Sequence, residues 1–147
     1  MSEGRPRILI VDDDVALADS LAAMLGKAGA YDIRIVHLAA EAIAAAAEHE
    51  PTIVFLDIEL PDMSGYEVAK LLRQQPHLGA TRLIALTDSI EHPGREDARA
   101  AGFERYLVKP VTVVELHKVL RRSVSIGAGK SGNSQGEAIY RGFPDRQ

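Results

Sequence analysis

The chain has 147 residues, a formal net charge of −4 and no cysteine. This length predicts one domain with a sizeable core and a short tail, while the acidic balance and the scattered Lys and Arg residues argue against direct binding of nucleic acid. The lack of cysteine excludes disulfide and thiolate chemistry, and the polar start and short apolar runs predict neither a signal peptide nor a membrane span, so a soluble, cytoplasmic protein is expected.

Short apolar runs alternate five times with longer helical stretches, a pattern that is typical of β/α units around a parallel sheet. The predicted strands are Ile8 to Val11, Ile33 to Val36, Ile53 to Leu56, Leu83 to Leu86 and Tyr106 to Val108. The predicted helices are Val15 to Lys27, Ala39 to Glu48, a helix that begins after Ser64 as N-cap and ends before Pro76, Arg95 to Ala101, and Val113 to Val124. Because Arg34 puts a charge into the second strand, we expect that strand at an edge of the sheet. From Ser125 onward the apolar period stops, which predicts a folded domain over 1–124 and a flexible tail rich in glycine and serine over 125–147.

Polar side chains follow four of the predicted strands. Asp12 and Asp13 follow the first strand, Asp57 the third, Thr87 the fourth and Lys109 the fifth. These side chains should converge, because the ligand crevice of an open α/β sheet lies outside the carboxyl ends of its strands. Carboxylates about 4 Å apart repel by roughly 4 kcal/mol per pair at an effective dielectric constant near 20, so three of them favour a hard divalent cation such as Mg²⁺. Asp57 could then attack a phosphoryl group whose oxygens are held by the cation, Lys109 and Thr87.

Four ordered motifs carry a resemblance to a known family: Asp12-Asp13, the segment from Asp57 to Gly65, Thr87, and the segment from Tyr106 to Pro110. In these motifs the chain resembles the receiver domain of bacterial response regulators, the phosphoacceptor module of two-component signalling, over about Arg7 to Val124. The resemblance implies an α/β, flavodoxin-like, doubly wound fold with a five-stranded parallel sheet of order 2-1-3-4-5 and five helices. It also implies a signalling module similar to the single-domain chemotaxis regulators, and not an enzyme with dedicated substrate turnover.

The resemblance assigns roles to the residues of the predicted site. Asp57 receives a phosphoryl group from the phosphohistidine of a sensor histidine kinase or a histidine phosphotransfer protein. Lys109 binds that phosphoryl group, and the Lys109–Pro110 peptide bond is cis, as proline alone readily permits. The implied magnesium ligands are Asp12, Asp13, Asp57 and, through its backbone carbonyl, Glu59.

The resemblance further implies a conformational switch. When Thr87 moves onto the phosphoryl group, Tyr106 swings inward, and the face formed by the fourth helix, the fifth strand and the fifth helix changes for an unidentified protein target. Tyr106 could instead be a half-buried strand aromatic, and Thr87 a plain hydroxyl at a strand end. The chain departs from the family at Asp88, where a small residue is usual, and this charge puts the rate and lifetime of phosphorylation in question. The histidines show no ligand spacing and are expected to be solvated; they are His37, His49, His77, His92 and His117.

Three alternatives compete with this interpretation. A haloacid-dehalogenase-like phosphatase would use Asp12 as its nucleophile, but it needs a second acidic pair after its lysine, and none follows Lys109. A flavodoxin-like electron carrier needs a first loop rich in hydroxyls and glycine, whereas this loop is acidic. A degenerate receiver that only docks is favoured by Asp88 alone. Because the tail is too short for a helix-turn-helix unit, we expect a single-domain regulator, a phosphorelay intermediate or a receiver cut from a longer chain.

Overall fold

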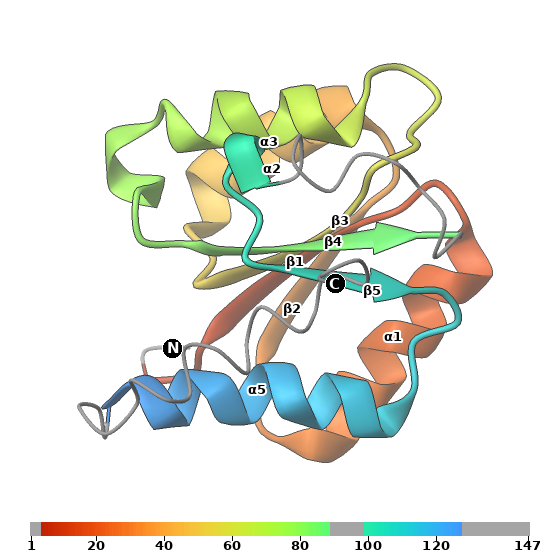
Figure 1. Cartoon of the computed structure of the whole chain (residues 1–147), viewed down its shortest axis with the longest axis vertical. Coiled ribbons are helices and arrows are strands. Elements are labelled where there is room, and N and C mark those ends of the chain that lie inside the picture. The colour runs from red at the N-terminus through yellow and green to blue at the C-terminus, as the bar shows by residue number, and fades with distance from the viewer. Residues whose placement is uncertain (1–3, 89–98, 128–147) are drawn as a thin grey trace.

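One parallel sheet runs through the centre of the protein, whose computed structural model describes residues 4–88 and 99–127 (Figure 1). The five strands lie in the order β2-β1-β3-β4-β5, and every neighbouring pair is parallel. The strands are β1 Arg7–Val11, β2 Asp32–Val36, β3 Ile53–Asp57, β4 Arg82–Thr87 and β5 Arg105–Val108. The predicted fold class and strand order are therefore confirmed.

Helices cover both faces of the sheet. They are α1 Val15–Ala28, α2 Ala39–His49, α3 Gly65–Arg73 and α5 Val113–Gly127, with a 3-10 helix, η1 Pro76–Leu78, after α3. Figure 1 shows α2 and α3 on one face and α1 and α5 on the other. Within the described ranges, no helix is both long enough and apolar enough to cross a membrane.

Two predicted segments extend beyond what the structure describes. Of the predicted fourth helix, residues 99–101 are helical and are followed by Gly102 at φ 102°, while residues 95–98 lie outside the described residues. The fifth helix, α5, continues past its predicted end at Val124 to Gly127. Residues 125–127 of the predicted tail therefore belong to this helix, and residues 128–147 lie outside the described residues.

Each strand contributes side chains to two separate hydrophobic cores, because successive side chains of a strand point to opposite faces of the sheet. In β1, Ile8 and Ile10 pack with residues of α1 and α5, whereas Leu9 and Val11 pack with residues of α2 and α3. All four side chains are 0% exposed, as is Phe55 in the adjacent β3. Burial on both faces explains why the strands appear in the sequence as unbroken apolar runs and not as an alternating pattern.

The edge strand β2 behaves as predicted, but His49 does not. Arg34 projects from β2 and pairs with Glu48 of α2, with 3.0 Å between nitrogen and oxygen. The expectation that all five histidines are solvated is wrong for His49, which is 6% exposed. Its Nε2 donates to the backbone carbonyl of Asp32 (3.1 Å), and its own carbonyl accepts from Nε of Arg7 (2.6 Å). These bonds join the end of α2 to the starts of β1 and β2, and they satisfy a ring that burial would otherwise leave without a partner.

Candidate functional site

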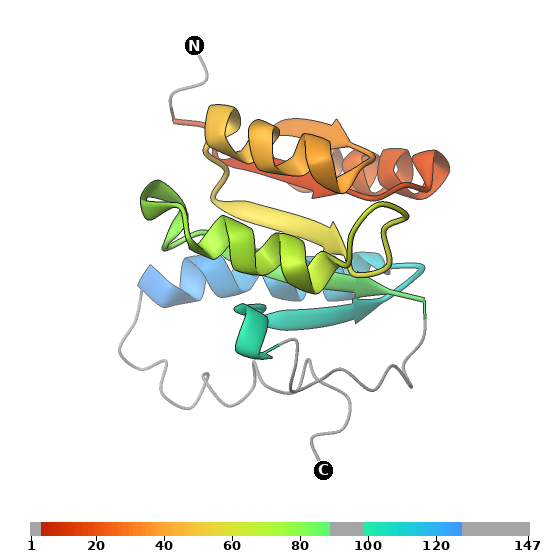
Figure 2. The ribbon, with the colours of Figure 1, turned by 90° about the horizontal axis from the view of Figure 1, so that it is seen from above.

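The register of the sheet brings the predicted site residues to one edge. Val11 lies opposite Leu56, and Asp57 lies opposite Leu86. The last residue of β4, Thr87, lies opposite Val108 of β5. Because all the strands run in the same direction, the residues at their carboxyl ends are neighbours, and Figure 2 shows the five arrowheads at the same side of the molecule. The strand ends that precede or carry Asp12, Asp57, Thr87 and Lys109 therefore lie at one edge of the sheet.

Three carboxylates form a compact acidic cluster at this edge. One oxygen from each of Asp12, Asp13 and Asp57 lies within 4.8 Å of the other two. Asp12 and Asp57 are almost completely buried, at 1% and 4% exposure, while Asp13 is exposed to solvent. Hard divalent cations prefer several oxygen ligands with room for water, and two buried carboxylates beside an exposed one provide that donor set.

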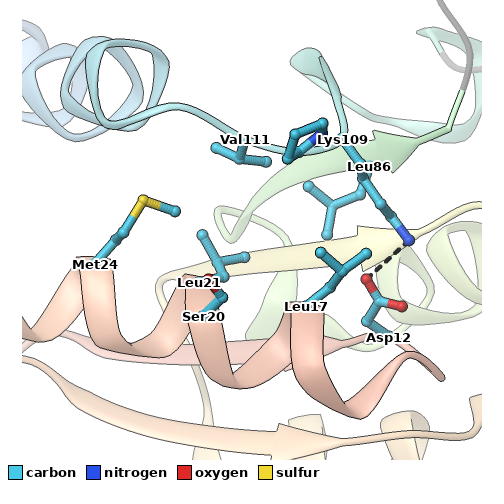
Figure 3. A pocket seen from close by; sticks show the side chains of 9 residues that line it. Asp12, Leu17, Ser20, Leu21, Met24, Leu86, Lys109 and Val111 are labelled. Carbon is cyan, nitrogen blue, oxygen red and sulfur yellow. Dashed lines mark ion pairs between the residues drawn. The ribbon is translucent and has the colours of Figure 1, made fainter.

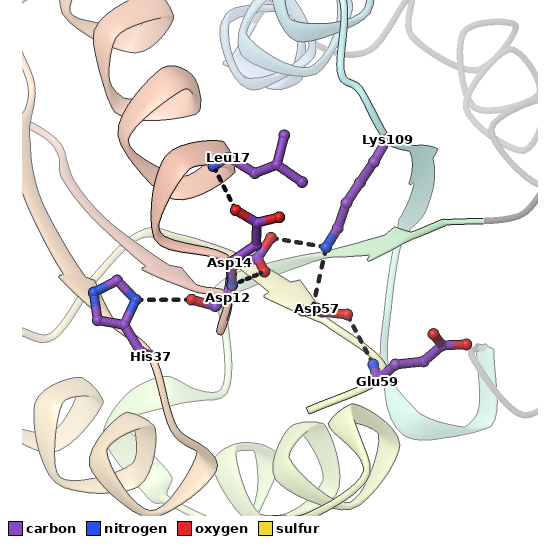
Figure 4. A network of polar contacts seen from close by, with 7 residues as sticks. All are labelled: Asp12, Asp14, Leu17, His37, Asp57, Glu59 and Lys109. Carbon is purple, nitrogen blue, oxygen red and sulfur yellow. Dashed lines mark hydrogen bonds and ion pairs between the residues drawn. The ribbon is translucent and has the colours of Figure 1, made fainter. Parts of the chain in front are cut away.

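Backbone amides hold the two buried carboxylates in place (Figure 4). Oδ1 of Asp12 accepts from the amide of Asp14 at 2.9 Å, and Oδ1 of Asp57 accepts from the amide of Glu59 at 2.8 Å. Asp14 is not part of this cluster but caps α1 by accepting from the amide of Leu17 at 3.1 Å. Of the three consecutive acids, one therefore stabilises a helix end, and two remain available to a cation.

Lys109 bridges the two buried carboxylates. Its Nζ lies 2.9 Å from Oδ2 of Asp12 and 3.2 Å from Oδ2 of Asp57, and its side chain is 9% exposed. Burial disfavours charge on this ammonium, but the hydrogen bonds and charges of Asp12 and Asp57 outweigh it, so the pKa of Lys109 lies above its usual value. The peptide bond from Lys109 to Pro110 is cis, as the resemblance implied.

The environment of Asp57 makes its negative charge costly. Burial raises the pKa of Asp57 to about 7, although the Glu59 amide and the Lys109 ammonium oppose the shift and the Asp12 carboxylate adds to it. A divalent cation next to this carboxylate would favour its charged form, which is the form able to act as a nucleophile. The geometry of the cluster therefore suits a metal-assisted carboxylate.

Gly65 allows α3 to begin directly against the end of β3. A Cβ at this position would lie 2.4 Å from the backbone oxygen of Asp57 and 2.5 Å from Cα of Ile58. The amide of Gly65 donates to the carbonyl of Ile58 at 3.1 Å, and an antiparallel bridge joins Glu59 to Ser64. Ser64 caps α3, as predicted, through the amide of Tyr66 at 3.1 Å. Only a glycine fits here, and the tight loop it permits presents the Glu59 amide to Asp57.

The two residues of the predicted switch are both buried. Thr87 is 0% exposed, and Tyr106 is 5% exposed in the core beneath α2 and α3. Tyr106 lies opposite Ala85 in the pairing of β4 with β5. Asp88 follows Thr87 and is exposed. Thr87 therefore lies at the carboxyl end of β4, and Tyr106 lies in the core on the neighbouring strand β5.

A small cavity flanks the site between α1 and the segment that follows β5 (Figure 3). Asp12 and Lys109 lie at one end of it, and its walls include Leu21, Met24 and Val111. Its volume of about 40 Å³ corresponds to a few water molecules, far below the several hundred Å³ of pockets that hold drug-sized ligands. This cavity therefore has no room for a flavin.

Two polar contacts near the site were missed from the sequence. Nδ1 of His37, at the end of β2, donates to the backbone carbonyl of Asp12 at 2.9 Å (Figure 4), so this histidine is part of the structure around the acids and not simply solvated. The carboxylate of Asp62 accepts from the amides of Ala39 and Ala40 at the start of α2. His37 could have been suspected, because it follows a strand at the same edge, but no local pattern marks Asp62.

Comparisons with known proteins identify the family of this chain. The family model described as the response regulator receiver domain matches residues 8–121. The DNA-binding response regulator MtrA of Mycobacterium tuberculosis is 35% identical over 117 residues, which cover 79% of this chain and 49% of that protein. The chain thus spans about half the length of MtrA and of the other MtrA proteins that it matches.

Solved structures with the same fold include a chemotaxis response regulator and the receiver domain of a sensor histidine kinase. The chemotaxis response regulator CheY4 of Vibrio cholerae is 28% identical, with a TM-score of 0.73 over 80% of this chain and 98% of that one. The receiver domain of sensor histidine kinase PA1611 from Pseudomonas aeruginosa is 30% identical, with a TM-score of 0.73 over 80% of this chain and 96% of that one, and that structure has a magnesium ion coordinated in its active-site cleft. Because the family model extends from the first strand into α5, the chain belongs to the response regulator receiver domain family of two-component systems.

Proposed function

We propose that this receiver domain accepts a phosphoryl group on Asp57 from the phosphohistidine of a sensor histidine kinase or a histidine phosphotransfer protein. One observation carries the proposal: Nζ of Lys109 lies 2.9 Å and 3.2 Å from two buried carboxylates, those of Asp12 and Asp57, at the converging ends of the strands. A purely structural ion pair would need one carboxylate. The second carboxylate, with the exposed Asp13 beside it, supplies an excess of negative charge that a divalent cation would balance.

The chemistry follows from the positions of these groups. An oxygen of Asp57 attacks the phosphorus in line, the bond from phosphorus to the donor's histidine nitrogen breaks, and an acyl phosphate forms on Asp57. Asp12, Asp13, Asp57 and the backbone carbonyl of Glu59 would hold a magnesium ion. When bound, that ion would neutralise charge between the acidic cluster and the phosphoryl oxygens.

Lys109 and Thr87 would bind the remaining phosphoryl oxygens. Lys109 already lies within 3.2 Å of Oδ2 of Asp57, so a short movement of its ammonium can transfer its bond from that carboxylate to a phosphoryl oxygen. Thr87 is the last residue of the neighbouring strand β4 and directly follows Leu86, which lies opposite Asp57, so its hydroxyl would bind another phosphoryl oxygen. Neither residue turns over a substrate of its own, which agrees with a signalling module.

The output of the domain would be a change of surface. Movement of Thr87 toward the phosphoryl group would alter the packing around Tyr106 on β5, and with it the face that includes β5 and α5. The phosphoryl group would shift the population between two packings by binding one of them better. The recipient would be a protein target, since the charge pattern gives no support for nucleic acid as a direct partner of this domain.

The test is phosphorylation by acetyl phosphate, with and without magnesium, followed by intact-mass spectrometry. The wild-type protein should gain one phosphate only in the presence of magnesium, and Asp57→Asn should gain none. Asp19→Asn, which removes an exposed carboxylate from α1, is the matched control and should behave like the wild type. Incorporation by Asp57→Asn at the wild-type rate would reject the assignment, and no incorporation by any protein would favour a receiver that only docks.

A further inference from the structure

The start of α2 is capped by a residue from a different part of the chain. The residue at the N-cap position is Leu38, whose apolar side chain cannot accept a hydrogen bond from the first helical amides. Asp62 caps the helix instead: its Oδ1 accepts from the amide of Ala39 at 2.9 Å, and its Oδ2 accepts from the amide of Ala40 at 3.1 Å. Both oxygens of one carboxylate are thus used on a helix terminus that lies 23 residues earlier in the chain.

Asp62 belongs to the loop between β3 and α3, the loop that begins at the proposed phosphorylation site. At the base of this loop, the amide of Glu59 donates to Oδ1 of Asp57 at 2.8 Å, and Glu59 pairs with Ser64 across the loop. Asp62 lies between these two ends. Its bonds to Ala39 and Ala40 therefore fasten the tip of the loop to α2, the helix that Figure 2 shows next to α3 on the same face of the sheet.

The same junction also contacts the other loop that carries acidic residues. His37, which precedes α2, donates from Nδ1 to the backbone carbonyl of Asp12 at 2.9 Å (Figure 4), and the amide of Asp12 donates to the carbonyl of Val36 at 3.2 Å. The segment from Val36 to Ala40 thus binds the β1–α1 loop on one side and the β3–α3 loop on the other. A change in either contact would alter how the two halves of the acidic cluster face each other.

The electrostatics of Asp62 agree with a charged carboxylate that is hydrogen-bonded to the start of α2. The hydrogen bond from Ala39 is the main reason that the pKa of Asp62 lies below its usual value; partial desolvation opposes this, and the bond from Ala40 adds to it. A negative charge at the N-terminus of a helix is also favoured by the helix dipole. The carboxylate is therefore charged and bonded at neutral pH, although it lies on the surface.

We propose that Asp62 is a positioning residue for the acidic site: by capping α2 from the β3–α3 loop, it holds Asp57 and Glu59 in the geometry that a divalent cation requires. The effect of Asp62 on cation affinity rests on the proposed function. Its effect on the stability of the β3–α3 loop does not. Asp62 touches neither the cation nor the phosphoryl group. Its effect passes through the backbone of residues 59–62.

The first experiment needs no metal and measures amide hydrogen exchange by NMR. In Asp62→Ala, the amide of Glu59 should exchange at least about threefold faster, because the loop opens more often, while the amides of β1 and β3 keep their rates. The amides of Ala39 and Ala40 should also exchange faster. Unchanged exchange at Glu59, with faster exchange in α2 alone, would show that Asp62 stabilises only the helix, and this result would overturn the proposal.

The second experiment is a magnesium titration of the folded proteins by calorimetry, at a temperature where circular dichroism shows each variant to be fully folded. Asp62→Ala should bind magnesium about threefold to tenfold more weakly, which is less than the roughly tenfold to hundredfold loss seen when a group bonded directly to a metal ligand is removed, because Asp62 acts through the backbone of the loop. Asp62→Asn, which keeps one acceptor oxygen, should fall between Asp62→Ala and the wild type, and it serves also if Asp62→Ala folds poorly.

Loss of one surface charge needs a matched control. Glu41→Gln removes a carboxylate from the first turn of the same helix, but it keeps an acceptor for the amide of His37, to which Glu41 bonds at 3.2 Å. This variant should retain nearly the wild-type magnesium affinity. Equal weakening in Glu41→Gln and Asp62→Ala would attribute the effect to charge and overturn the proposal. Failure of the wild-type protein itself to bind magnesium would instead refute the proposed metal site, and the exchange experiment would still decide the role of Asp62.

Discussion

Replacement of Gly65 by alanine tests whether the close contact between α3 and β3 supports the site. The added Cβ would lie 2.4 Å from the Asp57 oxygen and 2.5 Å from Cα of Ile58, and both of these are backbone atoms that cannot rotate away. Ordinary contacts need about 3.4 Å, so the start of α3 must move by about 1 Å. Forced overpacking of this kind costs about 1 to 3 kcal/mol of stability. The movement would also lengthen the bond from the Gly65 amide to the carbonyl of Ile58 and displace Glu59.

Gly26→Ala is the matched control for this substitution. Gly26 lies in α1 and is exposed. Apart from the neighbouring backbone of its own helix, no atom lies within 4 Å of the Cβ that alanine would add. Alanine there should raise stability by about 0.5 to 1 kcal/mol, because glycine loses more backbone entropy in a helix. Urea unfolding followed by far-ultraviolet circular dichroism measures the stability of both variants. The rate of phosphorylation by acetyl phosphate measures the effect of each substitution on the site. If Gly65→Ala unfolds at the wild-type urea concentration and is phosphorylated at the wild-type rate, the close contact has no role and the reasoning is wrong.

Four further predictions concern the charges of the site and the surface. Magnesium titrations should show weaker binding by Asp12→Asn and Asp13→Asn and slightly stronger binding by Lys109→Ala, because that variant loses a competing positive charge. Wild-type affinity in all three variants would refute the proposed metal site. Asp88→Ala should be phosphorylated by acetyl phosphate several-fold faster at low ionic strength and at nearly the wild-type rate at high ionic strength, and equal rates at both would refute an electrostatic barrier. Arg73→Ala should lose about 2 kcal/mol of stability in urea unfolding, because the guanidinium donates to the carbonyls of Thr81 (2.6 Å) and Gly102 (2.7 Å), whereas Arg34→Ala, which breaks an exposed pair, should lose under about 1 kcal/mol. Removal of residues 128–147 should leave the rate of phosphorylation unchanged, since their composition offers little apolar surface to bury, and a slower rate would assign the tail a role.

Most of the fold and much of the site could be predicted from the sequence because both depend on local patterns. Apolar runs mark buried parallel strands, and a polar residue directly after such a run must lie at the carboxyl edge of the sheet. These patterns alone locate Asp12, Asp57, Thr87 and Lys109. The end of α5 was harder to predict, because Ser125 and the glycines after it resemble a tail, whereas the structure continues the helix to Gly127.

The contacts that were missed join residues far apart in the chain. His49 is buried because the end of α2 lies over the start of β2, and its partner Asp32 is 17 positions away. Asp62 resembles an ordinary loop acid until α2 is placed next to it. The spacing of residues along the chain carries no information about such pairs. The partners meet only when α2 has packed on the sheet, beside β2 and the β3–α3 loop.

The most direct test of the central claim is to locate the phosphoryl group on the chain. Reduction with borohydride converts an aspartyl phosphate to homoserine, so that peptide mapping by mass spectrometry identifies the residue that carried the phosphate. After treatment with acetyl phosphate and magnesium, the protein should show homoserine at position 57 and at no other aspartate. Homoserine at position 12 would contradict this account and support a phosphatase-like nucleophile, and phosphate that survives borohydride on a histidine would show that Asp57 is not the acceptor.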